Sequence, residues 1–120
     1  MIEYEAVDLT LGDDRYTLEA TPRVARTLNR AYSGLLNIMD RVRRWDIDVV
    51  VDVINVGSGL NYRGAKRDAL WDAVYTADRD NDLAEKVVEF VALVITGGRR
   101  PGAQPGDGTG DAAASGEGKP

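Results

Sequence analysis

An alternation of acidic residues in the second half of the chain is the pattern closest to a metal site. The acids alternate and end at the twelfth position of the run: Asp78, Asp80, Asp82 and Glu89. Carboxylates with this spacing supply most of the oxygen ligands of a calcium-binding EF-hand loop. The sixth position of such a loop needs Gly for a sharp turn, and Leu83 stands there instead. A small calcium-binding module at Asp78–Glu89 is therefore the alternative, not the favoured interpretation.

The start of a helix explains the same acids more simply. Residues 83–96 form one continuous helical pattern that contains Glu89, so this carboxylate is not free to fold back onto an ion. Asp82 and Glu85 have the spacing of an acidic capping box, and acids before a helix favour its positive dipole end. We predict a helix start here and no metal site.

The stretch "GLNYRGAK" has part of the pattern of a phosphate-binding loop. Gly59, Gly64 and Lys66 follow a valine-rich run. The lysine is displaced by one residue, and no Ser or Thr follows it to hold magnesium. The valine run is also better interpreted as a helix than as the strand that such a loop requires. We expect no nucleotide and no other cofactor.

Composition excludes most catalytic chemistry. The 120 residues include no Cys and no His, which excludes disulfides, thiol catalysis, thiolate zinc sites and imidazole bases. We therefore expect a non-enzymatic protein without catalytic residues. The net charge of -5 argues against a nucleic-acid partner. No apolar run approaches membrane-spanning length, and the start "MIEYEAVDLT" does not have the features of a signal peptide, so we expect a cytoplasmic protein without membrane contact.

A change of composition near residue 97 divides the chain. Residues 98–120 are rich in Gly, Ala and Pro and contain no aromatic or large aliphatic side chain, so we expect a disordered tail. Residues 1–97 are expected to form one folded α+β domain. Its N-terminal part, "EYEAVDLTLGDDRYTLEA", alternates apolar and polar residues around a Gly-Asp turn, which predicts a β-hairpin packed against helices.

Four to five helices are predicted after the hairpin. Thr21 and Pro22 are a good N-cap and first-turn pair, and Gly34 breaks or bends the helical run that follows. The stretch "WDIDVVVDVINVGSG" favours a strand by propensity, but its alternation fails at residues 49–51 and its apolar spacing favours a helix. The predicted helices lie near residues 22–33, 35–44, 47–57 or 59, 64–77 and 83–96.

The aromatic residues are the candidate partner-binding residues. They fall near loop ends or away from the aliphatic stripes: Trp45, Tyr62, Trp71 and Tyr75. Trp and Tyr are over-represented at protein-binding hot spots, and they are also ordinary core residues, so both roles stay open.

The order of elements resembles that of a known family. The stretch "VDLTLGDDRYTLEATPRVARTLNRAYSGLLNIMDRV" has a short hairpin around a Gly-Asp turn, a Thr-initiated helix and then "GLLNIMDRV". A helix ending near a glycine and a final "NDLAEKVVEFVALVITGG" helix follow. Over about residues 5–98 this resembles the small tail assembly chaperones of long-tailed bacteriophages and the related gene transfer agent proteins.

The resemblance implies a role and a partner. Such proteins bind the aggregation-prone tape-measure protein in the host cytoplasm while the tail tube assembles, and they are absent from the mature virion. The family often makes a longer product by ribosomal frameshifting, and that extension recruits tail tube subunits. The alternative is a structural tail or head-tail joining protein that remains in the particle. Self-association is compatible with either role.

Overall fold

The structure, a computed structural model, describes residues 4–77 and 82–98. An antiparallel two-stranded hairpin, β1 (Ala6–Leu11) and β2 (Asp14–Glu19), begins the fold. Within the described residues five helices follow: α1 (Pro22–Tyr32), α2 (Leu35–Arg43), α3 (Ile47–Gly57), α4 (Ala65–Tyr75) and α5 (Leu83–Ile95). The predicted α+β fold, a hairpin packed against four to five helices, is confirmed.

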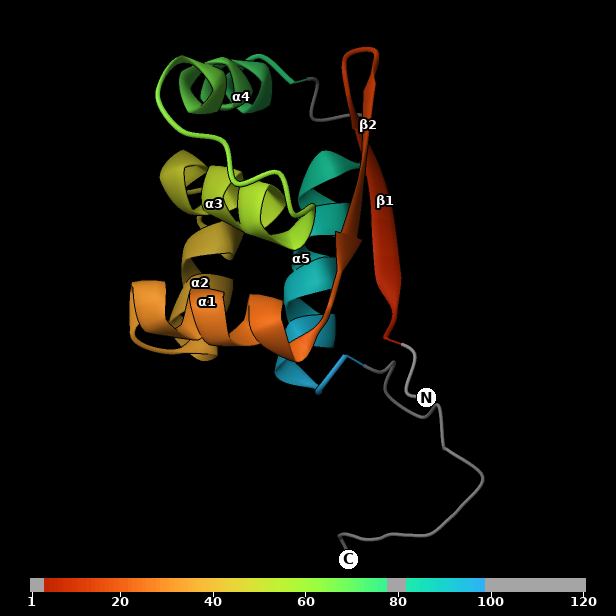
Figure 1. Ribbon diagram of the computed structural model, residues 1–120, viewed down its shortest axis with the longest axis vertical. Helices are drawn as coiled ribbons and strands as arrows, with labels where there is room; N and C mark the ends of the chain where they lie inside the picture. The colour runs from red at the N-terminus through yellow and green to blue at the C-terminus, as the bar shows by residue number, and fades with distance from the viewer. Residues whose placement is uncertain (1–3, 78–81, 99–120) are drawn as a thin grey trace, which may run out of the picture.

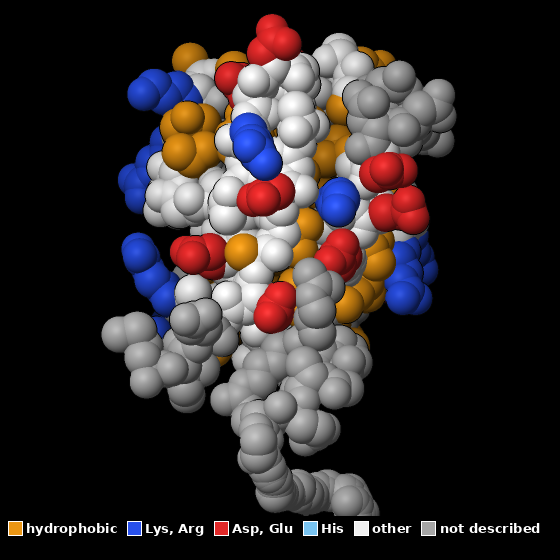
Figure 2. All heavy atoms as spheres, turned by 90° about the vertical axis from the view of Figure 1, so that its right-hand side faces the viewer, with side chains coloured by type: hydrophobic (Ala, Val, Ile, Leu, Met, Phe, Trp, Pro, Cys, Tyr) orange, Lys and Arg blue, Asp and Glu red, His pale blue; other side chains and the backbone are white. Residues whose placement is uncertain are grey.

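The hairpin lies along one side of the helices (Figure 1). Val7 is opposite Leu18 in the strand register, and both are buried. Gly12 is the first of the two turn residues and has φ of 61°, which matches a type II′ turn, whose twist suits the flanking strands. The outer face carries acidic and basic side chains (Figure 2). One apolar and one charged face are what the alternating sequence predicts.

α1 begins and ends where the sequence predicts. Oγ1 of Thr21 accepts a hydrogen bond from the N–H of Val24 at 3.3 Å, and Pro22 occupies the first helical position. Ser33 and Gly34, with φ of 58° and 128°, then interrupt the helical run before α2. The predicted break at Gly34 is therefore confirmed.

α3 is the central helix of the fold. It contacts the other four helices and β2 in the described structure. Five of its apolar residues are 0% exposed: Val49, Val50, Val51, Val53 and Ile54. A helix that is apolar on nearly all sides is stable only inside a core. This burial overrides the strand propensity of Val and Ile, and the helical interpretation is confirmed.

α5 begins at Leu83, as predicted, but the expected capping box is wrong. Asp82 has φ of 60°, and its side chain makes no capping hydrogen bond. An N-cap side chain reaches the first turn from an extended backbone, and the left-handed backbone of Asp82 does not provide that geometry. The remaining acids of the alternating run, Asp78 and Asp80, lie outside the described residues.

Gly98 joins the end of the fold to its beginning. Its N–H donates to the carbonyl of Leu93 at 2.7 Å, and its own carbonyl accepts the N–H of Glu5 at 2.9 Å. It has φ of 83°, and a Cβ at this position would lie 2.4 Å from the carbonyl oxygen of Ala20. Only glycine fits this position. The folded part thus includes Gly98, while the remainder of the expected tail, residues 99–120, lies outside the described residues.

Candidate binding site

A groove of about 860 Å³ lies between the end of α2 and the first turns of α5. Its apolar lining consists of Val42, Trp45, Ala77, Leu83, Ala84 and Val88. Charged residues line the two sides: Arg43 and Arg44 at the end of α2, and Glu85 and Glu89 on α5. An apolar groove between helices with charged sides suits an amphipathic helix of a partner.

Trp45 has an unusual backbone for its residue type. Its φ is 59°, in the left-handed region, directly after the C-cap residue of α2. Its N–H donates to the carbonyl of Val42 at 2.9 Å, and the N–H of Asp46 donates to the carbonyl of Arg41 at 3.0 Å. These two bonds form a Schellman motif, in which glycine is the usual residue at this position. A bulky residue there costs about 1–2 kcal/mol of backbone strain.

The strain at Trp45 indicates that its side chain has a role. Glycine would end α2 at lower cost, and tryptophan at this position instead places a half-buried indole in the lining of the groove. Strained backbone is concentrated at functional sites, where the surrounding structure holds it in place. Trp45 is therefore the strongest candidate contact residue of the groove.

Trp71 and Tyr75 lie together on α4. Their ring centroids are 5.5 Å apart and the rings are tilted by 19°, which is a stacked pair. Trp71 also donates from Nε1 to Oδ1 of Asp48 on α3 at 2.8 Å. Tyr75 is 66% exposed. The pair is thus both an attachment of α4 to α3 and an exposed aromatic surface.

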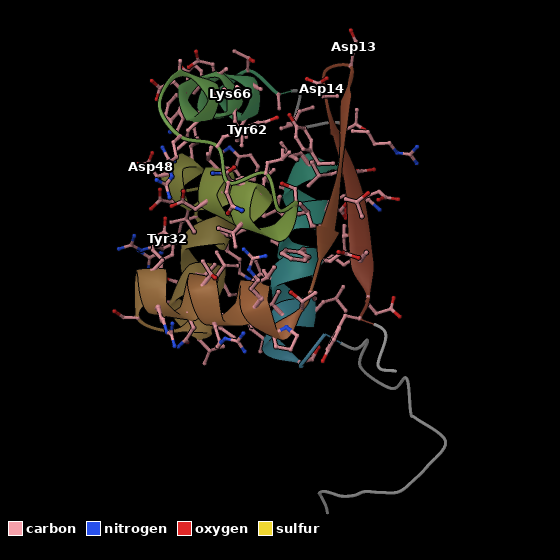
Figure 3. All side chains as sticks on the ribbon, in the orientation of Figure 1. Asp13, Asp14, Tyr32, Asp48, Tyr62 and Lys66 are labelled. Atoms are coloured by element: carbon pink, nitrogen blue, oxygen red, sulfur yellow. The ribbon has the colours of Figure 1, made fainter. Side chains whose placement is uncertain are left out.

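Tyr62 holds the connection between α3 and α4. Asn55, a buried residue of α3, donates from Nδ2 to the carbonyl of Tyr62 at 3.0 Å and accepts its N–H on Oδ1 at 2.6 Å. The ammonium group of Lys66 lies 5.7 Å from the centre of the Tyr62 ring, and Figure 3 labels Lys66 on α4 and Tyr62 just below this helix. The backbone of Tyr62 therefore has a structural role, whereas its half-buried ring lies near the hairpin.

The four candidate aromatic residues are distributed over three places. Trp45 lines the groove, Trp71 and Tyr75 share the surface of α4, and Tyr62 lies beside Asp14 and Tyr16 of the hairpin. They do not form one continuous binding surface within the described residues. Of the three places, the groove alone combines an apolar hollow with a strained aromatic residue.

A polar network that sequence reasoning missed joins α1, α3 and α4. Tyr32 donates its hydroxyl proton to Oδ2 of Asp52. Arg67 donates to Oδ1 of the same carboxylate, from Nη2 at 2.9 Å and from Nε at 3.3 Å. The only sequence signal was an acid on a helix that is otherwise mostly apolar, because the partners lie 20 and 15 residues away along the chain.

The Asp52 network is suited to structure rather than to proton transfer. Burial and then the hydrogen bond with Asp52 raise the pKa of Tyr32 well above its ordinary value, and the bond to Asp52 raises the pKa of Arg67. Tyr32 therefore stays protonated and Arg67 stays charged across the physiological range. Both groups keep donating to one carboxylate, and α4 is attached to the rest of the fold through it.

Comparisons with protein-family models, curated proteins and solved structures give no match to this chain. Among residues 4–77 and 82–98, no group of three or more acidic side chains is placed to hold a metal ion. None of the helices in these residues is long and apolar enough to cross a membrane.

Proposed function

We propose that this chain is a non-enzymatic assembly chaperone for a phage-type tail. It binds apolar helical segments of the tape-measure protein in the host cytoplasm and keeps that protein soluble while the tail tube assembles. It is absent from the mature particle. The order of the hairpin and helices is the order on which the resemblance to such chaperones is based.

Trp45 is the observation that carries this proposal. A tryptophan in left-handed backbone, at a position where glycine is usual, has an explanation if its indole contacts a partner. The groove that it lines runs between two helices, and α2 and α5 can receive the apolar face of a third helix. A long helical client offers many such faces.

The charges of the groove give the client helix a preferred orientation. Arg43 and Arg44 lie on one side, and Glu85 and Glu89 lie on the other. A client helix with acids along one flank and bases along the other is therefore favoured in the orientation that places its acids beside Arg43 and Arg44. We further propose that a longer product of the gene carries an additional segment that recruits the tail tube protein.

Co-expression with a tape-measure protein from the same genome tests this function. The measurement is the soluble fraction of the client and its co-purification with this chain. Trp45→Gly should abolish both effects, because it removes the indole from the groove and keeps a residue suited to the backbone. Leu36→Ala is the matched control, since Leu36 is 73% exposed on α2 and does not line the groove.

Each result has a defined meaning. Client solubility that depends on Trp45 but not on Leu36 supports the chaperone. A client that is indifferent to the wild-type chain contradicts it. Detection of this chain in purified particles would instead favour a structural tail or head-tail joining protein.

A further inference from the structure

Alternate residues of β2 direct their backbone groups away from β1. The N–H of Ala20 donates to the carbonyl of Glu5 at 3.1 Å, so residues 5 and 20 are a hydrogen-bonded pair. Every second pair of the strand register, counted from this one, is then hydrogen-bonded between β1 and β2. By the alternation of an antiparallel ladder, the N–H and C=O groups of three β2 residues then point outward: Arg15, Thr17 and Glu19. In the described chain, no backbone hydrogen bond reaches the outward groups of Arg15 or Thr17. The outward backbone groups of Arg15 and Thr17 can therefore pair with another strand, beside the hollows that this edge shares with residues 58–62 of the connection between α3 and α4.

The charges along this edge complement those of the same edge in a second, antiparallel copy. If β2 pairs antiparallel with β2 of a second copy and Thr17 faces Thr17, then Arg15 of each copy faces Glu19 of the other. These side chains are exposed and lie on the same outer face of the sheet. Opposite charges on facing strands stabilise a pairing, and the two-fold symmetry makes the contact twice. The carbonyl of Glu19 already accepts the N–H of Thr21 at 3.0 Å, but a carbonyl oxygen has two lone pairs.

The same register places acidic turn residues next to basic helix residues. Asp13 and Asp14 lie at the tip of the hairpin, as Figure 3 shows. In the pairing about Thr17, the tip of one copy reaches the start of α1 in the other, where Arg23 lines a hollow with Thr21. The first turn of α1 contains no acid that would repel them. This is a second complementary charge contact, and it follows from the same register.

The other edge of the hairpin does not share this property. The outward residues of β1 are Ala6, Asp8 and Thr10. Pairing β1 with itself about Asp8 places the carboxylates of two copies opposite each other, and like charges on facing strands are destabilising. When each strand pairs with itself about its central outward residue, the β2 edge therefore brings opposite charges together and the β1 edge brings like charges together.

We propose that the β2 edge is the surface on which two copies of this chain form a symmetric dimer. The hairpins join into one four-stranded antiparallel sheet with Thr17 on the two-fold axis. Because a two-fold contact uses the same edge from both copies, the assembly closes at the dimer and does not extend into a filament. This inference is independent of the tail function.

Sedimentation and light scattering over about 1 μM to about 1 mM of the full chain test the dimer directly. We expect a monomer–dimer equilibrium in the wild type. Thr17→Pro removes an outward N–H that β1 does not use, so it should abolish the dimer. Thr10→Pro is the matched control, because it makes the same change on the outward side of β1. Circular dichroism of each variant verifies that the hairpin is folded.

A charge exchange tests the register itself. Arg15→Glu and Glu19→Arg each place like charges across the axis, and each should weaken dimerisation by about tenfold because the contact occurs twice. The double variant Arg15→Glu/Glu19→Arg restores opposite charges and should recover most of the wild-type affinity. A wild type that stays monomeric at about 1 mM, a dimer unaffected by Thr17→Pro, or a double variant without recovery overturns the proposal.

Discussion

The indole N–H of Trp71 donates to Oδ1 of Asp48 at 2.8 Å, and this bond joins α4 to α3. α4 buries only Leu70 and Val74 fully, and its main contact in the described structure is with α3. The attachment of this helix thus depends on few apolar residues, with the Trp71–Asp48 bond and the Arg67–Asp52 ion pair beside them.

The Trp71–Asp48 bond should be measurable by a double-mutant cycle. Trp71→Phe removes the donor but keeps a ring against Tyr75, and Asp48→Ala removes the acceptor. We expect a coupling energy of about 1 kcal/mol from urea unfolding of the four proteins, since Asp48 is exposed and water competes for the bond. Strictly additive effects would show that the bond contributes nothing to stability.

At position 45, glycine should be more stable than alanine. Both substitutions lose the half-buried indole, but only glycine adopts φ near 59° without strain. We expect Trp45→Gly to exceed Trp45→Ala in free energy of unfolding by about 1 kcal/mol, as measured by urea denaturation. This order is the reverse of that inside a helix. Alanine equal to or better than glycine would contradict the left-handed geometry.

Tyr32 should make stability depend on pH in the alkaline range. Its pKa is raised in the folded state, first by burial and then by the bond with Asp52. The folded chain therefore holds this proton when the unfolded chain releases it, and the stabilisation is present below about pH 10 and is lost as the pH rises further. Unfolding in urea from pH 8 to pH 11 should show a steeper loss for the wild type than for Tyr32→Phe. Equal slopes would exclude the contribution of this tyrosine.

Gly97 and Gly98 separate backbone strain from steric conflict. Both have positive φ, 80° and 83°, but a Cβ at residue 97 meets nothing within 4 Å, whereas one at residue 98 meets the Ala20 carbonyl at 2.4 Å. Gly97→Ala should cost about 1 kcal/mol, and Gly98→Ala should cost at least about 1 kcal/mol more. Thermal unfolding of the two variants provides the comparison. Similar losses would mean that the chain shifts at Gly98 to admit the methyl group.

Local patterns were sufficient to predict most of the fold. Apolar alternation around Gly12 predicts the hairpin, and the Thr21–Pro22 pair predicts the start of α1, because in each case the deciding interactions lie within a few residues. α3 was harder, since its valines favour a strand by propensity, and the helix was indicated by the failure of alternation and by the helical spacing of its apolar residues. The capping box at Asp82 was wrong because the backbone there depends on how the chain approaches α5.

The candidate site was less accessible to sequence reasoning. Trp45 was proposed as a contact residue, but the groove that it lines is formed by α2 and α5, which are segments about 40 residues apart. Its left-handed backbone belongs to the Schellman motif at the end of α2, where the usual sequence signal is a glycine. The Asp52 network joins residues of three helices, and nothing in the spacing of Tyr32 and Arg67 indicates that they share a carboxylate. Contacts of this kind depend on the tertiary structure, and local sequence patterns do not predict them.

The hydrogen bond between Gly98 and Glu5 makes the described chain topologically close to a ring. The end of α5 lies beside the start of the hairpin, as Figure 1 shows, so a short linker could join residues 98 and 4 without moving any helix. New ends could then be opened in the connection between α3 and α4, giving a circular permutant with the same core. α5, at 13 residues and about 20 Å, separates this seam from the groove at its other end. A protein fused at this junction of residues 98 and 4 would therefore lie at the opposite end of α5 from the groove.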